Sequence, residues 1–291
     1  MKKVEQKYII KNAQSFILKD VFTCGQCFRW NNETDGSFTG IFGKNVLNVK
    51  MVNDKDIIIR GICDGNIETV VNQYFDLNRD YEKIKIQLSK IDENIANSIK
   101  CGEGIRILNQ DLWETIISFI ISANNNIPRI KLIIEKMSKE YGDKIIFEGK
   151  EYYTFPTVNQ LSKASIQDLR NLGVGFRDKY IYNTTKMVKN KELDLEKLKL
   201  EKSTQKIRKK LLTLSGVGPK VADCILLFST LKRFDVFPVD VWVRRVMNDL
   251  YIHNPEEKKV NKKYIENLAK EKFGDLEGIA QQYLFYWKRE N

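Results

Sequence analysis

The sequence contains only one histidine, His253, and so has very little of a residue on which many enzymes depend. This histidine lies in the polar stretch YIHNPEEKK, which argues against a Ser-His-Asp triad or a Cys-His pair. If the protein is an enzyme, we therefore expect its nucleophile or base to be a lysine or a carboxylate.

Cysteine is scarce and unevenly placed. Cys24 and Cys27 form a CxxC pair, but no second close pair follows, so a closed zinc site would have to recruit distant cysteines. The total of five is odd and the chain shows no export signal, a combination typical of reduced thiols. We expect no metal site and interpret these cysteines mainly as small packing residues.

Long hydrophobic runs are also absent. No apolar stretch reaches about 18 residues, roughly the length that crosses a membrane. The start, MKKVEQKYIIKN, lacks the apolar middle of a signal peptide. We therefore expect a cytoplasmic protein with no membrane partner.

Positive charge is what the sequence has in excess. The formal net charge of the 291 residues is +11 and the isoelectric point is about 9.2. This balance favours a polyanionic partner, nucleic acid first, although a generally lysine-rich proteome would give the same balance. A composition of 42% hydrophobic and 30% charged residues indicates a folded chain.

Two sequence patterns divide the chain. Residues 37–43, 45–52 and 56–61 are short, partly alternating segments separated by turn residues, which predicts an antiparallel meander. From Asp111 onward nearly everything reads as helix, ending with a helix over about 276–288. We predict an α+β fold in which a small antiparallel β-sheet domain with flanking helices (1–100) packs on a larger all-α domain (101–291).

A glycine corner between two helices is prominent in the C-terminal half. The sequence from about residue 207 to 231 predicts two helices joined by Gly-Val-Gly. Glycines at 216 and 218 let the backbone approach another molecule closely, and the second helix presents N–H groups and a positive dipole end that suit a phosphate. The pattern predicts a grip on the DNA backbone that ignores base sequence, although a tight helix corner needs glycine in any case.

Lys220 follows this corner and heads an apolar run, Val221 to Phe228. A positive helix end and burial both disfavour the ammonium form, so we expect a reactive amine with a lowered pKa. The alternative is a lysine that simply pairs with a phosphate. Asp240 lies in the loop of residues 235–242 and is placed as the N-cap of the next helix. We expect its carboxylate to share a cleft with Lys220.

The segment LSGVGPKVADCILLF and the following VFPVDVW resemble the helix-hairpin-helix, Gly/Pro-rich loop and aspartate signature of base-excision DNA glycosylases. A lysine at this hairpin position is what bifunctional members carry. No cysteine follows Cys224, which disfavours the iron–sulfur branch. Further segments extend the resemblance, in the same order, to the 8-oxoguanine DNA glycosylase/AP lyase family: CGQCFRW (24–30), GIRILNQDLWETIISFIISANNNIPRI (104–130), LGVGFRDKYI (172–181) and AQQYLF (280–285).

The resemblance implies that the enzyme flips a damaged base out of duplex DNA. Lys220 would attack the sugar C1′ to give a Schiff base that allows β-elimination, and Asp240 would stabilise the developing positive charge. Other positions carry over as well: the base pocket would comprise Gly25, Cys224, Gln281 and Phe285; the orphan cytosine and the wedge would involve Asn124, Arg129, Phe176 and Arg177; and phosphate contacts would come from Gly216, Val217, Gly218 and Trp242.

Two positions depart from the family pattern. Trp242 stands where some relatives have a histidine, which puts its phosphate contact in doubt. Pro128 stands where others have a small residue, which bears on how Arg129 points and thus on how strictly cytosine is required.

The expected partner is duplex DNA containing 8-oxoguanine, bound by a monomer associated with the nucleoid. No organic cofactor or catalytic metal is required, although the hairpin carbonyls could hold a monovalent cation. Two alternatives stay open at this point. One is a helix-hairpin-helix glycosylase for another lesion, such as an oxidised pyrimidine or an alkylated purine. The other is a non-catalytic module that binds DNA backbone, which would need neither Lys220 nor Asp240.

Overall fold

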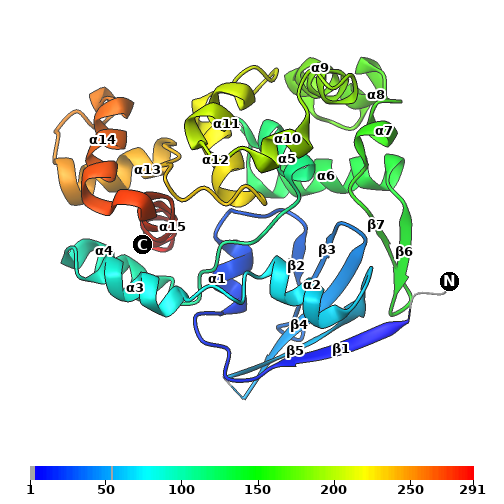
Figure 1. The fold of residues 1–291 in the computed structure, drawn as a ribbon, viewed down its shortest axis with the longest axis horizontal. Coiled ribbons are helices and arrows are strands. Elements are labelled where there is room, and N and C mark those ends of the chain that lie inside the picture. The colour runs from blue at the N-terminus through cyan, green and yellow to red at the C-terminus, as the bar shows by residue number, and fades with distance from the viewer. Residues whose placement is uncertain (1–3, 54) are drawn as a thin grey trace.

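The computed structural model describes residues 4–53 and 55–291. Its N-terminal part contains a five-stranded antiparallel sheet in the order β1-β5-β4-β3-β2 (Figure 1). Strands β3 to β5 confirm the predicted meander, whereas β1 and β2 extend it at both edges and were not predicted. The strands are β1 (Glu5–Ile10), β2 (Trp30–Asn32), β3 (Phe38–Phe42), β4 (Asn45–Val52) and β5 (Asp56–Ile62).

A hydrophobic core forms between this sheet and the helices beside it. Ile57 and Ile59 lie two residues apart on β5, so both side chains point to the same face, and both are fully buried. Helix α1 (Leu18–Thr23) adds Phe22, whose ring stacks on Trp30 with centroids 4.0 Å apart. The other helices of this part are α2 (Ile67–Tyr74), α3 (Tyr81–Ser89) and α4 (Glu93–Cys101).

The rest of the chain is mostly helical and confirms the predicted fold class. Helix α5 is the expected central helix, because nine of its eleven residues are buried. None of the helices in residues 4–53 and 55–291 is long and apolar enough to cross a membrane. The helices are α5 (Leu112–Ser122), α6 (Ile127–Tyr141), α7 (Val158–Leu161), α8 (Ile166–Asn171), α9 (Asp178–Lys189), α10 (Leu195–Leu200), α11 (Thr204–Leu211), α12 (Pro219–Phe228), α13 (Val241–Met247), α14 (Lys262–Phe273) and α15 (Glu277–Glu290).

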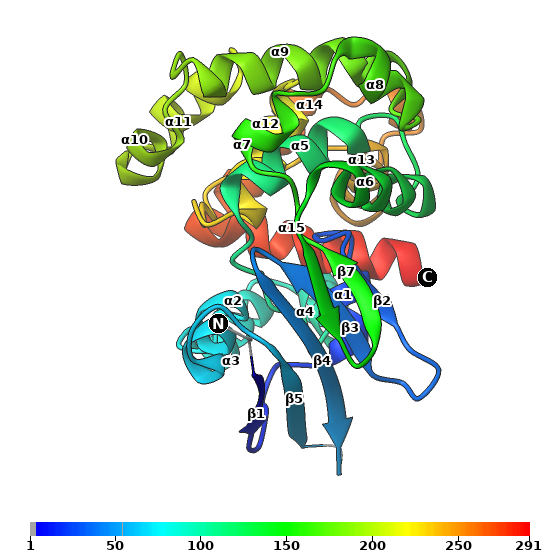
Figure 2. The same cartoon turned by 90° about the vertical axis from the view of Figure 1, so that its right-hand side faces the viewer.

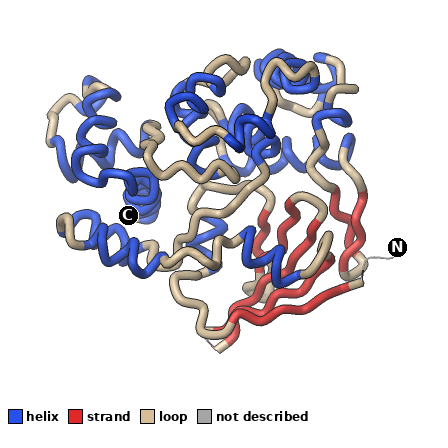
Figure 3. The backbone as a smooth tube through the Cα atoms, in the orientation of Figure 1, coloured by secondary structure: helices blue, strands red, loops and turns tan. Residues whose placement is uncertain are grey.

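The helical region also contains a β-hairpin that the sequence analysis did not anticipate. Strands β6 (Lys144–Phe147) and β7 (Lys150–Tyr153) pair antiparallel across a turn at Glu148 and Gly149, both of which have positive φ. Phe147 packs in a small cluster with Ile41 and Val46 of the sheet, and Figure 3 shows the hairpin beside that sheet. The hairpin therefore ties the helical region to the N-terminal sheet.

The C-terminal helix α15 makes a second connection between the two parts. It packs against α4 on one side and against α13 and α14 on the other. Figure 2 shows α15 running between the sheet with α1 to α4 below and the other helices of the helical region above. Residues near the end of the chain are thereby brought beside residues near its beginning.

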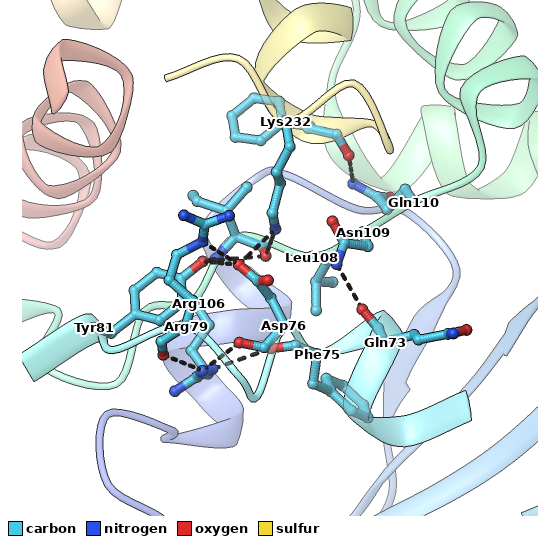
Figure 4. Close-up of polar contacts among 12 residues, drawn as sticks. Gln73, Phe75, Asp76, Arg79, Tyr81, Arg106, Leu108, Asn109, Gln110 and Lys232 are labelled. Atoms are coloured by element: carbon cyan, nitrogen blue, oxygen red, sulfur yellow. Dashed lines mark hydrogen bonds and ion pairs between the residues drawn. The ribbon is translucent and has the colours of Figure 1, made fainter. Parts of the chain in front are cut away.

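A buried polar network makes the third connection (Figure 4). The guanidinium of Arg106 donates to the carbonyl of Phe75 at 3.1 Å and to that of Asp76 at 2.6 Å. The carboxylate of Asp76 pairs with Lys232 at 3.3 Å, and Lys232 also donates to the carbonyl of Ile107. Because these groups come from the α2–α3 loop, residues 105–110 and the segment after α12, the network fixes α12 relative to the sheet.

Candidate active site

A small cavity lies where α12, α13, α15 and the loop after α1 meet. It has a volume of about 40 Å³. All six residues predicted for catalysis and the base pocket line it: Gly25, Lys220, Cys224, Asp240, Gln281 and Phe285. Residues that the sequence analysis missed complete the wall: Cys24, Phe119, Phe228, Pro238 and Gln282.

The start of α12 presents Lys220 to this cavity. Gly218 is the N-cap residue and makes no side-chain cap, and Pro219 occupies the first turn of the helix, where its missing N–H costs nothing. Gly216 adopts a left-handed conformation with φ of +81°, and a Cβ there would lie 2.8 Å from the ring of Tyr180. Only glycine fits at this position, so the close approach of α9 is the local reason for the first glycine of the sequence Gly-Val-Gly.

Lys220 is placed against aromatic and titratable side chains. Its Nζ lies 5.7 Å from the centroid of the Phe119 ring. Cys224 first, and then Asp240, raise the pKa of Lys220, and together they outweigh the lowering effect of burial. The lowered pKa expected from the sequence is therefore wrong. The largest cause is Cys224, one helical turn after Lys220 and visible in the sequence, whereas the contribution of Asp240 depends on tertiary packing.

Cys224 lies one helical turn after Lys220 and is buried. Burial raises the pKa of its thiol to about 11, despite the lowering effect of Lys220. The amine and the thiol are therefore a coupled pair, in which each side chain favours the charged form of the other.

Asp240 occupies the predicted N-cap position of α13. One carboxylate oxygen accepts a hydrogen bond from the backbone N–H of Val243 at 2.9 Å. The carboxylate has no other hydrogen-bond partner in the described part of the chain. The same group thus caps a helix and lines the cavity with Lys220.

Gly25 forms the wall of the cavity that comes from the N-terminal part. Its φ is +85°, and a Cβ at this position would lie 3.3 Å from the ring of Phe285. The flanking residues hold the loop in place. Gln282 donates to the carbonyl of Cys24 at 2.6 Å, and the amide of Gln26 donates to the carbonyl of Arg106 at 2.7 Å.

Gln281 stands beside Phe285 on the same face of α15. Its side-chain oxygen Oε1 is buried and has no hydrogen-bond partner in the described structure. Leaving a buried acceptor unpaired costs about 1–3 kcal/mol, so this oxygen is prepared to accept a hydrogen bond from a molecule that enters the cavity.

The four residues predicted for the orphan base and the wedge form a second group outside the cavity. Asn124, in the turn between α5 and α6, has a left-handed backbone with φ of +51°. Phe176 is 59% exposed, whereas the neighbouring Arg177 is only 3% exposed and packs with its guanidinium 4.3 Å from the Phe176 ring centroid. Arg129 is exposed on α6 and reaches the carbonyl of Gly173 at 3.3 Å.

The predicted phosphate contacts have different local environments. The N–H of Val217 already donates to the carbonyl of Leu214 at 3.2 Å, and its side chain is buried. Gly218 is exposed at the uncapped start of α12, where helical N–H groups are open to an anion. Trp242 is 43% exposed, and the guanidinium of Arg245 lies 5.5 Å from its ring centroid.

No group of three or more His, Cys, Asp or Glu side chains within residues 4–53 and 55–291 is arranged to hold a metal ion. All five cysteines are free thiols, including the Cys24 and Cys27 pair. Burial raises the pKa of Cys24 to about 12, which indicates a packing residue rather than a thiolate ligand. The monovalent cation at the hairpin stays a prediction.

The chain matches two protein families along most of its length. Residues 8–116 match the family described as 8-oxoguanine DNA glycosylase, N-terminal domain. Residues 117–272 match the family described as HhH-GPD superfamily base excision DNA repair protein. The boundary between the two matches falls within α5.

Individual relatives agree with these matches. A probable N-glycosylase/DNA lyase of Methanothermobacter thermautotrophicus is 33% identical over 241 residues, which cover 76% of this chain and 74% of the relative. The N-glycosylase/DNA lyase of Saccharomyces cerevisiae is 30% identical over 264 residues, covering 81% and 68%. The Clostridium acetobutylicum 8-oxoguanine glycosylase/lyase, solved with double-stranded DNA containing cytosine opposite 8-oxoG, is 43% identical with a TM-score of 0.92 over 100% of this chain and 99% of that one.

Proposed function

This chain belongs to the 8-oxoguanine DNA glycosylase family of base excision repair enzymes, and we propose that it excises 8-oxoguanine from duplex DNA and then cleaves the strand as an AP lyase. One observation carries the proposal. An amine, a carboxylate, a buried unpaired amide oxygen and an aromatic ring, contributed by three helices, all line one cavity. A module that only grips DNA backbone has no use for that arrangement.

The cavity must open before a base can enter. Its volume of about 40 Å³ is room for roughly three water molecules but not for a purine. Phe285 lies against Gly25, so movement of this ring away from the glycine would create a slot between them. A flipped base would then stack on Phe285, as bases commonly do on aromatic side chains in enzymes that act on them.

Two polar groups would recognise the base in this slot. 8-Oxoguanine carries a hydrogen on N7 that guanine lacks, and the backbone carbonyl of Gly25 would accept it. The unpaired Oε1 of Gln281 would accept a hydrogen bond from the base edge. A net hydrogen bond contributes about 0.5–1.5 kcal/mol, and the discrimination grows where guanine would leave the carbonyl buried and unpaired.

Lys220 would perform the covalent step. Its raised pKa means that the side chain is an ammonium in the free enzyme, so it must lose a proton before the nitrogen can attack. The nitrogen then bonds to C1′ as the bond from C1′ to the base breaks, and the departing base takes up a proton. Loss of the ring oxygen from C1′ leaves an imine, through which the 3′ phosphate is eliminated.

Asp240 would stabilise the positive charge that develops on the sugar as the base leaves. A unit charge about 4 Å away at an effective dielectric constant of 20 is worth about 4 kcal/mol, or roughly a thousandfold in rate. Its contribution as a helix cap is about 1 kcal/mol. The electrostatic role therefore dominates the expected effect on catalysis.

The exposed residues around Asn124 would act on the opposite strand. Asn124 would fill the space that the flipped base leaves, and Phe176 would wedge into the base stack. Arg129 and Arg177 offer N–H donors to the acceptor atoms of an orphan cytosine. These assignments support a preference for 8-oxoguanine opposite cytosine.

Borohydride trapping tests the proposal. The imine should be reduced to a stable protein–DNA adduct on duplexes that contain 8-oxoguanine, and Lys220→Gln should abolish the adduct while DNA binding survives. Duplexes with other oxidised or alkylated bases serve as comparisons. A different lesion trapped more efficiently than 8-oxoguanine would reassign the substrate, and full trapping in the Lys220→Gln variant would place the nucleophile elsewhere.

A further inference from the structure

Arg289, in the last turn of α15, lies at the rim of the base pocket. The central carbon of its guanidinium is 5.7 Å from the ring centroid of Phe285 and 5.4 Å from that of Tyr286. Its Nη1 lies 3.9 Å from the point that a Cβ on Gly25 would occupy. Arg289 thus contacts the same two residues, Gly25 and Phe285, whose separation would open the slot, and its guanidinium lies at the edge of that slot.

The guanidinium of Arg289 has unused donors. A guanidinium carries five N–H groups, and the one hydrogen bond of this side chain within residues 4–53 and 55–291 goes from Nη2 to the carboxylate of Glu290 at 3.3 Å. That carboxylate also accepts from Lys19 at 3.5 Å. The side chain of Arg289 is only 22% exposed, because it packs against two aromatic rings. It is therefore held in place while most of its donors stay available to a ligand.

8-Oxoguanine carries a matching group on the edge that would face Gly25. Its N7 hydrogen would be donated to the carbonyl of Gly25, and the adjacent C8 carries the oxygen O8, which is a hydrogen-bond acceptor. Guanine has neither group, since its N7 is an acceptor and its C8 carries only hydrogen. A donor beside the Gly25 carbonyl therefore suits O8, and Nη1 of Arg289 lies at this position.

We propose that Arg289 contacts the substrate directly, by donating a hydrogen bond to O8 of the flipped base. The inference rests on the proposed function, because it takes the slot between Gly25 and Phe285 as the place of the base. The contact would also assist bond breaking. As the nitrogen of Lys220 bonds to C1′, the electron pair of the bond from C1′ to N9 stays on N9 and spreads through C8 onto O8. A guanidinium at O8 stabilises this negative charge until the base takes up a proton.

A binding experiment tests the contact apart from catalysis. In the Lys220→Gln background, Arg289→Met should reduce the preference for an 8-oxoguanine duplex over a guanine duplex by about 10- to 100-fold, the range for a hydrogen bond with a charged partner. Methionine keeps an apolar stem but removes the donors. Affinity for a duplex with a tetrahydrofuran abasic analogue, which has no base, should stay unchanged. Equal weakening on all three duplexes would assign Arg289 to a phosphate and overturn the inference.

Lys288→Met is the matched control. Lys288 carries the same charge in the same turn of α15, pairs with Asp249 at 2.7 Å and does not line the cavity. This variant should leave the preference for 8-oxoguanine over guanine intact. An equal loss of preference in Lys288→Met and Arg289→Met would attribute the effect to positive charge at the helix end, and the inference would fail.

The choice of oxygen is tested with 8-oxoadenine, which keeps O8 and the N7 hydrogen but has an amino group in place of O6. Arg289→Met should weaken the preference for 8-oxoadenine over adenine by a factor similar to that for the guanine pair. A loss confined to 8-oxoguanine would place the contact at O6 rather than O8 and would overturn the assignment.

Single-turnover rates test the role in bond breaking. With Lys220 intact and the duplex saturating, Arg289→Met should slow 8-oxoguanine excision by at least about tenfold. Cleavage of a preformed abasic site, from which no base departs, should be unchanged. If the wild type itself fails to excise 8-oxoguanine, the proposed function fails. A wild type that excises the lesion, matched by Arg289→Met in both preference and rate, would overturn this inference alone.

Discussion

The lesion pocket and the orphan-base side of the site are built in opposite ways. The pocket draws Gly25, Lys220, Asp240 and Phe285 from distant parts of the chain and has a volume of about 40 Å³. The orphan-base side uses two short turns, around Asn124 and Phe176, and its wedge ring is 59% exposed. The pocket therefore depends on how the two halves of the molecule pack, whereas the orphan-base side depends on local backbone geometry.

The two regions also differ in how well their polar groups are hydrogen-bonded before DNA binds. The pocket is closed by Phe285 against Gly25 and keeps a buried acceptor of Gln281 unpaired, so binding the correct base relieves a cost. On the other side, the guanidinium of Arg177 is already satisfied by carbonyl oxygens. We therefore expect the pocket to determine selectivity for the lesion. We expect the two turns around Asn124 and Phe176 to assist the flipping of the base.

The largest expected effect is on the pocket side. Asp240→Asn removes the charge but keeps a good N-cap, so the helix should remain stable. We expect excision to fall by roughly a thousandfold opposite every base, because the sugar cation loses about 4 kcal/mol of stabilisation. Single-turnover rates and a thermal melt measure the two effects. A rate within a few fold of the wild type would show that the carboxylate is only a cap.

The second prediction concerns the fit between Gly25 and Phe285. Gly25→Ala places a methyl group 3.3 Å from the ring at a backbone φ of +85°. We expect 8-oxoguanine excision to fall by about 10- to 100-fold, since a left-handed non-glycine residue costs about 1–2 kcal/mol and the slot narrows. Cleavage of a preformed abasic site, which needs no base in the slot, should change much less.

Gly36→Ala is the matched control for this prediction. Gly36 has a similar φ of +79°, but a Cβ there meets no atom within 4 Å. It should carry the backbone cost without the loss of excision. Equal losses of excision in the two variants would assign the defect to backbone strain alone.

The third prediction tests the orphan-base side of the site. Arg129→Ala should reduce the preference for cytosine opposite the lesion by about tenfold, within the 1–3 kcal/mol range of a good arginine–base contact. Excision opposite the other bases should change less. The measurement is a set of single-turnover rates with each opposite base. Arg60→Ala, a surface arginine paired with Glu148, serves as the control and should leave the preference intact.

The smallest effect lies outside both regions. Burial raises the pKa of Glu277, at the start of α15, to about 7, and the nearby Asp235, Asp223 and Glu266 add to the shift. The raised folded-state pKa stabilises the protein below about pH 4.5, and this stability is lost as pH rises to about 7. Glu277→Gln should therefore raise the melting temperature by about 2–6 °C at pH 8 and by little at pH 4.5.

Activity should be unchanged in this variant, because Glu277 does not line the cavity. Thermal melts at the two pH values, together with an excision assay, measure both outcomes. An equal gain in stability at both pH values would mean that packing, rather than ionisation, controls the effect.

Much of the site was predictable because its residues lie in recognisable segments. Lys220 and Asp240, which stand out in the sequence itself, line one cavity with the four pocket residues that the family resemblance implies. Phe119 was missed because it sits in a helix that is apolar almost all round, where no position stands out from the sequence. Gln26 was missed for a related reason, since its partners at Arg106 and Leu108 are about eighty residues away in the chain.

Two further differences between the sequence predictions and the structure concern the β6–β7 hairpin and the pKa of Lys220. The β6–β7 hairpin is formed by the run KIIFEGKEYY, in which two short segments rich in isoleucine and aromatic residues flank a Glu-Gly turn, and this pattern is a signal that sequence reasoning could have used. The direction of the Lys220 pKa had only part of a signal. Cys224 lies one helical turn away and is visible in the sequence, but the distance of Asp240 from the amine is set by tertiary packing.

The place of α15 between the two halves has a consequence for how the enzyme is made. A chain growing from its N-terminus acquires Gly25 early and Lys220 and Asp240 later, but Gln281 and Phe285 only in its final helix. The amine capable of opening a sugar is thus synthesised before the surface that distinguishes a damaged base from a sound one.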